Sequence, residues 1–375
     1  MTRDEYRFWL CSSNVRRADI CMLLKRFGGP EEIFAADKEA LLKHSGLPAE
    51  TVQILEKSRK SGDFKRVFEK MQRDNISFVH DEHPDFPERL KILNDCPLAL
   101  YVRGTLPDDA VPSVGMVGAR ACSGYGREAA GRFARELAAG GVQIISGMAV
   151  GIDSHSAKGA LAVGGRTFAV LGSGIDVIYP AVNIGLYYEI VTSGGGIISE
   201  YPLGTQPISW HFPHRNRLIS ALSDRLLVIE AGKKSGSLST ACHALDQGKD
   251  VYALPGRIND CLSEGCNMLI YDGAGVLVKP HFLLEEIFRG KHPADETEPA
   301  GAEAGAGVPA AAGAETGAKS DVGRVLSLIG NEPVGIREIQ EKSGLDIAAA
   351  GSVLTELELA GLINRLPGGF YGRVI

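Results

Sequence analysis

Short apolar runs alternate with helical patterns through the middle of the chain, from Pro112 to about Gly290. The runs of strand length are SVGMVGA, VQIISG, TFAVLG, GGIISE, RLLVIEA, DVYALPG and GVLVK. Segments with helical spacing of apolar residues, such as GREAAGRFARELAAGG, lie between them. Near-continuous apolar strands that alternate with helices are typical of a parallel sheet covered on both faces. The pattern therefore predicts an α/β fold, in which ligands bind at the carboxyl ends of the strands near a topological switch point.

The N-terminal part, residues 1–75, has helical periodicity that is broken by Gly28-Gly29-Pro30 and by Ser45-Gly46. Helix pairs joined by glycine turns resemble helix-hairpin-helix or SAM-like modules, whose turn amides can contact a phosphate backbone. A small helical domain that packs or binds a partner is the alternative, and we favour it because these motifs are short. A Pro-rich bridge over residues 76–112 carries two strand-like runs, ISFVH and LALYVRG. We therefore expect the α/β domain to span residues 76–290.

The C-terminal part changes composition twice. Residues 291–320 are Ala, Gly, Pro and Glu with almost no bulky apolar residue, which predicts a flexible acidic linker. Residues 321–375 contain three helical patterns followed by INRLPGGFYGRV, which reads as two strands around a turn and so predicts a winged helix. Its third helical pattern carries Asp346, Glu356 and Glu358 but no Lys or Arg. Acidic side chains repel phosphates, so this module favours a partner-binding role over that of a winged-helix transcription factor.

Charge and cysteine content exclude several classes of protein. The net charge of −6 over 375 residues excludes a globally basic coat, so a polyanion must meet a local patch. No apolar run approaches the ~18 residues that span a bilayer, and the N-terminus lacks the apolar region of a signal peptide. The seven cysteines are scattered, and Cys261 and Cys266 have no matching pair that would complete a zinc site. We expect a cytoplasmic protein without a bound metal or cofactor.

The stretch from Ser209 to Gly256 predicts an anion-binding site. In it the apolar run LLVIEA is followed directly by GKKSGSLSTA, a Gly/Ser loop that opens a helix. Free backbone N–H groups and the positive end of the helix dipole favour a phosphate there. Arg215, Arg217, Lys233 and Lys234 lie around this loop. Residues two apart on a helix point about 200° apart, so we expect one arginine to face the phosphate loops and the other to lie along the groove or pair with an acid.

Three further expected strand ends carry glycine loops: VGAR, which ends at Arg120, SGMAVGID over 146–153 and LGSGIDVIYP over 171–180. Glycine lets backbone approach a phosphate closely. None of these loops is a full GxGxxG fingerprint or a GxxxxGK[ST] P-loop, so ATP hydrolysis by a P-loop is not expected. Four such loops on one edge of a sheet, with arginines nearby, favour phosphate binding over ordinary turn geometry.

The sequence shows no recognisable set of catalytic residues. A nucleophile needs a base and an orienting acid, and no such set is apparent. Asp153 is expected to cap its helix. His211 and His214 could stack on bases or pack structurally, and we favour packing. We therefore predict no catalytic residue.

Taken in order, these motifs resemble the DprA/Smf family of DNA-processing proteins. The matching segments are VGAR, SGMAVGIDSHSAKGAL, VLGSGIDVIYP, SEYPLG, FPHRNRLIS, EAGKKSGSLSTACHALDQGKDVYALPG and SEGCNMLIYDGA. The likeness covers nearly the whole chain except the linker. It implies an extended Rossmann-like fold, a homodimer, cooperative binding of single-stranded DNA and loading of the RecA recombinase during natural transformation.

The resemblance also implies site residues. Carried over motif by motif, the DNA contacts are Arg120, Arg215, Arg217 and Lys234, with a phosphate loop formed by Gly172, Ser173 and Gly174. The choice between Lys233 and Lys234 stays open. The family has Gly-Ser-Arg where this chain has Gly118-Ala119-Arg120, so one hydroxyl contact is in doubt.

An enzymatic alternative comes from the same superfamily, in phosphoribohydrolases of the Lonely Guy type that cleave nucleoside monophosphates. Their signature ends in Gly-Thr-x-x-Glu, and the matching place here is Gly236 to Thr240. Thr240 stands where the carboxylate would be and cannot act as an acid or base near neutral pH. We therefore predict a non-catalytic protein that binds single-stranded DNA.

Overall fold

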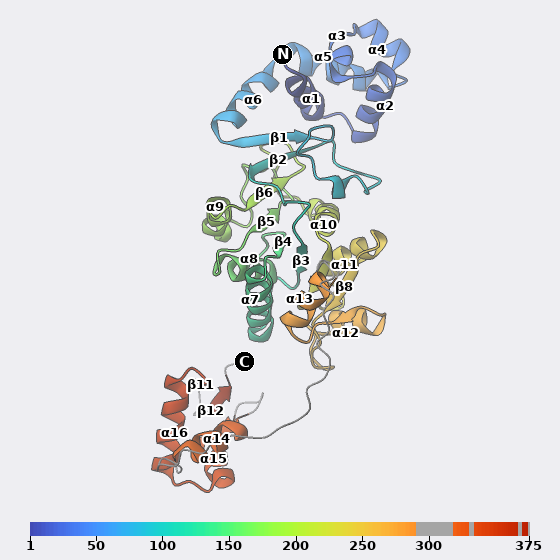
Figure 1. Ribbon diagram of the computed structural model, residues 1–375. Helices are drawn as coiled ribbons and strands as arrows, with labels where there is room; N and C mark the ends of the chain where they lie inside the picture. The colour runs from blue at the N-terminus through green and yellow to red at the C-terminus, as the bar shows by residue number, and fades with distance from the viewer. Residues whose placement is uncertain (290–317, 330–333, 367–369, 374–375) are drawn as a thin grey trace, which may run out of the picture. The chain divides into compact units, whose positions relative to one another are not determined.

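A mostly parallel sheet of nine strands forms the centre of the first of two structural units (Figure 1). The computed structural model describes residues 1–289, 318–329, 334–366 and 370–373. The two units are Met1–Asp295 and Glu296–Ile375. The predicted linker lies outside the described residues except for its last three, which belong to the first helix of the second unit.

The strand order in the large sheet is β1-β2-β6-β5-β4-β3-β7-β8-β9. Neighbouring strands from β6 to β9 in this order are parallel, whereas β2 is antiparallel to both β1 and β6. All seven strands predicted between Pro112 and Gly290 are confirmed, as are the two of the bridge. The bounds are β1 Ile76–His80, β2 Ala99–Gly104, β3 Ser113–Val117, β4 Gln143–Ser146, β5 Thr167–Val170, β6 Gly196–Ser199, β7 Arg225–Val228, β8 Asp250–Ala253 and β9 Gly275–Val276.

The topology creates a switch point next to β3. The chain leaves β3 toward β4 on one side, and it leaves β7, the other neighbour of β3, toward β8 on the opposite side. Connections that diverge in this way open a crevice at the carboxyl ends of the two strands, where ligands of such sheets bind.

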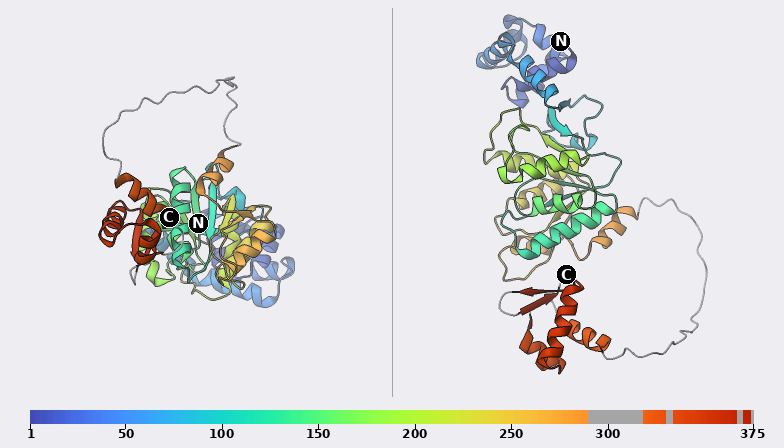
Figure 2. Two further views of the ribbon diagram at one scale, coloured as in Figure 1. Left: turned by 90° about the horizontal axis from the view of Figure 1, so that it is seen from below. Right: turned by 90° about the vertical axis from the view of Figure 1, so that its left-hand side faces the viewer.

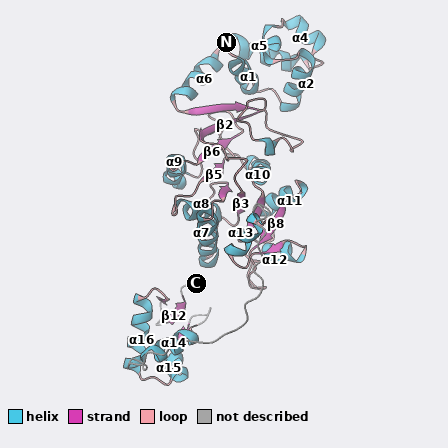
Figure 3. Ribbon diagram, viewed as in Figure 1, coloured by secondary structure: helices cyan, strands magenta, loops and turns pink. Residues whose placement is uncertain are grey.

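Helices cover both faces of the sheet (Figures 1, 2 and 3). Successive strand residues alternate between the two layers: Leu226 and Val228 pack in the core with one layer, and Leu227 packs with the other. The first layer contains α10 (His211–Leu222), α11 (Ser237–Asp246) and α12 (Glu264–Tyr271). The second contains α7 (Gly124–Ala139), α8 (Ile152–Leu161), α9 (Ile184–Thr192) and α13 (Pro280–Phe288). Short 3-10 turns lie at η1 (Glu88–Leu90) and η2 (Ala181–Asn183).

The N-terminal helices share a hydrophobic core with the edge of the sheet. Phe8 lies edge-on to Phe78 of β1 and to Tyr101 of β2, and all three are buried. The predicted breaks fall where Gly28 and Gly46 adopt positive φ. The helices are α1 (Arg3–Ser12), α2 (Arg17–Phe27), α3 (Pro30–Ala35), α4 (Lys38–His44), α5 (Ala49–Ser61) and α6 (Asp63–Arg73). This helical segment therefore packs as part of the first unit.

The second unit is a winged helix with a core of its own, as predicted. Leu354, Leu357, Ile363 and Tyr371 are among its buried residues. Its elements are α14 (Ala318–Leu328), β10 (Val334–Gly335), α15 (Ile336–Ser343), α16 (Ile347–Leu359), β11 (Ile363–Leu366) and β12 (Phe370–Arg373), with strand order β10-β12-β11. The predicted Pro-Gly-Gly turn at 367–369 lies outside the described residues.

Candidate nucleic-acid interface

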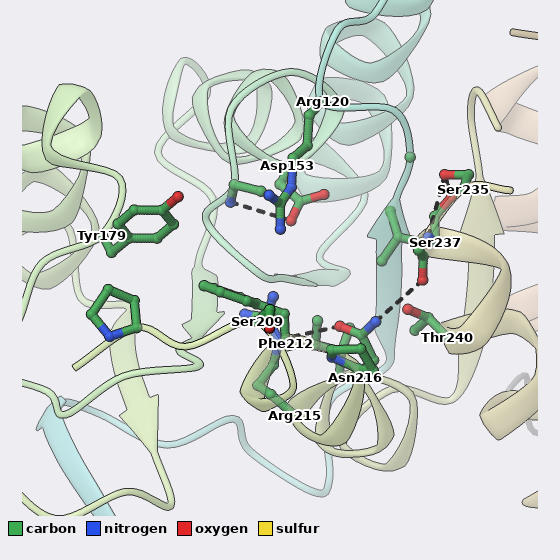
Figure 4. A pocket seen from close by; sticks show the side chains of 17 residues that line it. Arg120, Asp153, Tyr179, Ser209, Phe212, Arg215, Asn216, Ser235, Ser237 and Thr240 are labelled. Atoms are coloured by element: carbon green, nitrogen blue, oxygen red, sulfur yellow. Dashed lines mark hydrogen bonds between the residues drawn. The ribbon is translucent and has the colours of Figure 1, made fainter. Parts of the chain in front are cut away.

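A cavity of about 550 Å³ lies at the switch point of the sheet (Figure 4). It opens where the loops after β3 and β7 meet the first turns of α8, α10 and α11. The residues that line it are Val117, Gly118, Arg120, Ala149, Asp153, Tyr179, Pro207, Ser209, Phe212, Pro213, Arg215, Asn216, Ile219, Ser235, Gly236, Ser237 and Thr240. The cavity therefore lies at the strand ends that the glycine loops indicated, and it contains Arg120 and Arg215 of the predicted site residues.

Arg215 supplies a buried positive charge at the floor of the cavity. Its Nη1 donates to the carbonyl oxygens of Gly147, at 2.9 Å, and of Val170, and its Nε donates to Asn216 at 3.3 Å. Its Nη2 makes no hydrogen bond to the part of the chain that the structure describes. A Cβ at Gly147 would lie 2.5 Å from that Nη2, so glycine is needed there to let the guanidinium pass. Burial lowers the pKa of Arg215 to about 10, which leaves it charged at neutral pH.

Asp153 places a buried carboxylate beside this arginine. It lies inside the first turn of α8, whose N-cap is Gly151, so the predicted capping role is wrong. Its Oδ2 instead accepts hydrogen bonds from the backbone N–H groups of Gly147, at 3.2 Å, and Ala149, at 3.3 Å, and so holds the preceding loop. Burial raises the pKa of Asp153 to about 6, although the positive charge of Arg215 and the two N–H groups oppose the shift.

Arg120 and two aromatic rings form the outer part of the cavity. The Arg120 guanidinium carbon lies 5.2 Å from the ring centroid of Phe212, within cation–π distance. The rings of Tyr179 and Phe212 are 5.6 Å apart at an interplanar angle of 43°. Arg120 and Tyr179 are exposed, and Figure 4 shows both side chains pointing into the cavity. Ring faces next to a cation are the elements that single-strand-binding proteins use to stack bases and hold backbone.

The first turn of α11 completes the site with hydroxyl groups. The Oγ atoms of Ser235 and Ser237 are 2.7 Å apart, and Asn216 Nδ2 donates to the Gly236 carbonyl at 3.3 Å and to Ser239 Oγ at 3.0 Å. The N-cap residue, Gly236, has no side chain, and the Ser237 N–H donates to Ser235 Oγ at 3.4 Å. Gly236 and Ser237 line the cavity, so the positive end of the helix dipole lies at its wall. Thr240 is buried at the cavity wall.

The two lysines before this turn differ in their surroundings. Lys233 Nζ lies 3.6 Å from Glu264 in an exposed ion pair. Lys234 is also exposed, and it has no ion-pair partner within the described ranges of the chain. Neither lysine lines the cavity. A DNA contact by Lys234 therefore stays a prediction, and Lys234 is the freer cation of the two.

Arg217 faces away from the cavity, which corrects its predicted place in the site. Its Nη2 lies 2.7 Å from Glu200 Oε2, its Nη1 lies 2.9 Å from Glu200 Oε1, and its Nε lies 2.7 Å from Asp95 Oδ2. The expectation that Arg215 and Arg217 play different parts is confirmed. The physical reason is their spacing on α10, which directs one side chain into the cavity and the other to Glu200 and Asp95.

The predicted phosphate loop is buried. Gly174 N–H donates to the Thr205 carbonyl at 2.9 Å, and Ser173 Oγ donates to the Val177 carbonyl. Gly172 lies directly beneath Phe212, which a Cβ would approach to 2.9 Å. The start of α10 covers Gly172, and residues 202–205 lie against Gly174. None of the three loop residues lines the cavity, and the loop contributes Tyr179 instead.

His211 packs structurally, as favoured. It is buried, its ring stacks on Tyr201 at 4.0 Å, and its Nδ1 lies 3.1 Å from the Gly172 carbonyl.

Sequence reasoning missed Tyr179, Phe212, Asn216 and the serines of the α11 turn. A signal was present for two of them. Phe212 lies three residues before Arg215 in FPHRNR, and aromatic residues near basic ones are typical of single-strand-binding surfaces. Asn216 lies between the two arginines of the same segment. Tyr179 lies far from these residues in sequence, and only the folded chain brings it beside them.

Among the described residues, no group of three or more His, Cys, Asp or Glu side chains is placed to hold a metal ion. No helix in the same ranges is long and apolar enough to cross a bilayer. All seven cysteines lie in the described part, and none forms a disulfide.

Two family models match the chain. The model for DNA recombination-mediator protein A matches residues 77–288, and the model for the DprA winged helix domain matches residues 309–369. The first match contains the whole cavity.

Similar proteins agree with these matches. Protein Smf of Escherichia coli is 36% identical over 304 residues, which cover 80% of this chain and 78% of that protein. The X-ray structure of DNA processing protein A from Streptococcus pneumoniae is 30% identical with a TM-score of 0.64, and the match covers 78% of this chain and 99% of that one. A structure of DNA processing protein A from Helicobacter pylori, described for its single-stranded DNA binding mode, is 33% identical with a TM-score of 0.52. This match covers 58% of this chain and 97% of that one.

Proposed function

The chain belongs to the DNA recombination-mediator protein A family, and we propose that it binds single-stranded DNA in the cavity at the switch point of its sheet. In this proposal it protects strands that enter the cell and delivers them to RecA during natural transformation. Relatives named as DNA processing proteins and the single-strand binding of the Helicobacter pylori protein support it.

The combination of charge and ring faces in one cavity carries the proposal. Arg215 and Arg120 offer two positive charges, and the start of α11 adds the positive end of a helix dipole. The rings of Phe212 and Tyr179 lie at the opening. The positive charges suit a phosphate, and the aromatic rings suit an unpaired base. In a duplex the base faces are stacked on one another, so the rings favour a single strand.

We propose a non-catalytic role for the cavity. The wall position that carries the glutamate of phosphoribohydrolases holds Thr240. The cavity does contain one carboxylate, Asp153, but its Oδ2 accepts two backbone hydrogen bonds that hold the loop before α8. Asp153 is therefore assigned a structural and electrostatic role.

A salt titration tests the proposed function. Single-stranded oligonucleotides should bind at least about tenfold more tightly than duplexes of equal length, and the logarithm of affinity should fall linearly with the logarithm of salt by ~0.7 per phosphate contact. Arg120→Ala should reduce that slope by ~0.7, because the exposed guanidinium faces the strand. Arg132→Ala is the matched control, since Arg132 pairs with Glu136 on the surface of α7. Equal affinity for duplex DNA would overturn the proposal.

Two protein partners belong to the same proposal, RecA and a second copy of this chain. Both rest on the resemblance to the DprA/Smf family. Light scattering coupled to size exclusion tests them together. The protein alone should have twice the 39.9 kDa mass of one chain, and it should co-elute with RecA in a mixture. A monomeric mass would contradict the homodimer, and separate elution of RecA would contradict the contact with RecA.

A further inference from the structure

An exposed tryptophan stands next to the cavity without lining it. Trp210 is 60% exposed, whereas its neighbours Ser209 and Phe212 line the cavity. Large aromatic side chains bury most of their surface in folded proteins. An indole this exposed beside a proposed binding site is therefore a candidate contact for a bound ligand. Ile208, which is 43% exposed, extends the apolar surface.

The indole of Trp210 is held in place by other rings. It lies edge-on to His211, at 4.2 Å between centroids, and to His214, at 6.3 Å. His211 in turn stacks on the buried Tyr201. A ring that is already ordered loses little conformational entropy when a second ring stacks on it, which favours binding. We call this ring cluster, Trp210, His211, His214 and Tyr201, the platform; its rings are already arranged for a further ring to stack on Trp210.

The acidic groups near the platform, Glu200 and Asp95, are partly balanced by one guanidinium. Glu200 and Asp95 both bind Arg217, and His214 Nδ1 lies 3.1 Å from Glu200. Carboxylates that are paired in this way repel a phosphate backbone much less than free ones would. The ion pairs of Arg217 with Glu200 and Asp95 thus weaken the repulsion between this surface and a phosphate backbone.

We propose that Trp210 stacks on a nucleobase, so that a strand held in the cavity continues over the start of α10 onto the platform. This inference rests on the proposed single-strand binding and adds a second base site to it. Trp210 and Phe212 are two residues apart at the start of α10, and such side chains point to opposite sides of a helix. A strand that crosses the tip of α10 meets Phe212 on the cavity side and Trp210 on the other. Trp210 lies between Ser209 and Phe212 in sequence, and both of these line the cavity, which favours the next base of the same strand as the occupant of the platform.

Tryptophan fluorescence tests the proposal directly. The chain has two tryptophans, and the other, Trp9, is 1% exposed in the N-terminal core. In a Trp9→Phe variant, all tryptophan emission comes from Trp210. Titration with oligothymidylate should quench that emission, and the quenching should saturate at the concentration where the anisotropy of a labelled oligonucleotide saturates. Because Trp9→Phe alters a core residue, the wild-type protein is titrated in parallel, where buried Trp9 adds a constant background.

Affinity measurements on the natural chain provide the second readout. Trp210→Ala should weaken binding of a long oligothymidylate by roughly 5- to 150-fold, the range seen when one base-stacking ring is removed. Trp210→Phe should restore most of the affinity, because a phenyl ring also stacks. Tyr188→Ala is the control, since Tyr188 is an aromatic residue on α9 that is 50% exposed and does not line the cavity.

The outcomes separate this inference from the proposed function. If oligonucleotides raise the anisotropy but leave Trp210 emission and the affinity of Trp210→Ala unchanged, the second base site is wrong and single-strand binding in the cavity stands. If no oligonucleotide binds the wild-type protein, the proposed function itself fails. If Trp210→Ala changes the mass of the protein and not its affinity for DNA, the platform holds a second copy of the chain, and the inference is also wrong.

Discussion

Arg217→Ala should lower the free energy of unfolding by about 3–5 kcal/mol, because it leaves the buried carboxylate of Glu200 without its main partner. The Arg217 side chain is 5% exposed and that of Glu200 10%, so water cannot replace the lost contact. Burial alone would raise the pKa of Glu200, but hydrogen bonds from His214 and Arg217 hold it below its ordinary value. Urea unfolding followed by circular dichroism measures the loss.

The pH dependence of that stability follows from the direction of the shift. A carboxylate with a lowered pKa stabilises the folded state above the ordinary value of glutamate, ~4.3, and the contribution is lost as the pH falls through the folded value. The difference in the free energy of unfolding between wild type and Arg217→Ala should therefore be largest at neutral pH and decrease in acid.

A matched variant distinguishes the buried pair from an ordinary surface pair. Arg132→Ala removes an exposed contact with Glu136 on α7 and should change stability by less than about 1 kcal/mol. Where Arg217→Ala is still folded, its salt slope for single strands should equal that of the wild type. If Arg217→Ala has wild-type stability and a reduced salt slope, Arg217 contacts DNA and the ion-pair assignment is wrong.

Asp153→Asn should bind single strands more tightly at pH 7.5 and remove most of the pH dependence of binding. In the wild type, affinity should rise by roughly 5- to 30-fold between pH 7.5 and pH 5, since a like charge 6–8 Å from a phosphate opposes binding by about 1–2 kcal/mol at an intermediate dielectric constant. The cause is the pKa of Asp153, which burial raises to about 6, so the carboxyl is neutral at the lower pH. Asparagine keeps an oxygen that can accept the loop N–H groups.

Stability offers an independent check on the same group. The folded pKa of about 6 exceeds the ordinary aspartate value of ~3.9 by about 2 units, and at about 1.36 kcal/mol per unit this amounts to roughly 3 kcal/mol. Because the folded pKa is raised, this stability is present in acid and is lost as the pH rises through about 6.

Other groups titrate over the same range, so wild type and Asp153→Asn must be compared at each pH. The positive charges of Arg215 and Arg120 both oppose the rise in the pKa of Asp153. A wild-type affinity that does not vary between pH 5 and pH 7.5, or the same variation in both proteins, would show that Asp153 does not govern the cavity.

Local pattern was sufficient for most of the architecture. Apolar runs bounded by glycine predicted all seven strands between Pro112 and Gly290, and the switch from strand to helical spacing predicted the covering helices. The winged helix followed from three helical patterns and a hairpin. The spacing of apolar residues records which face of an element is buried, whatever it packs against, which is why periodicity reveals these elements.

The antiparallel start of the sheet depended on distant contacts. β2 pairs with β6, where Val102 lies opposite Ile198. Nothing local to LALYVRG specifies a partner so far along the chain. The same holds for the N-terminal helices, whose core is continuous with β1 and β2.

The sequence by itself predicted where a ligand site would lie. Glycine loops at strand ends, a helix that opens on serines, and arginines in FPHRNR indicate an anion site at the carboxyl edge of a parallel sheet. Tertiary structure decided which side chains reach it. Arg215 enters the cavity because Gly147 leaves room for its guanidinium, whereas Arg217, two residues later on α10, meets Glu200 and Asp95. The loop at 172–174 is closed by Phe212 from a segment about 40 residues away in sequence. Such outcomes depend on which distant surfaces pack together, and residue type and spacing along one chain do not contain that information.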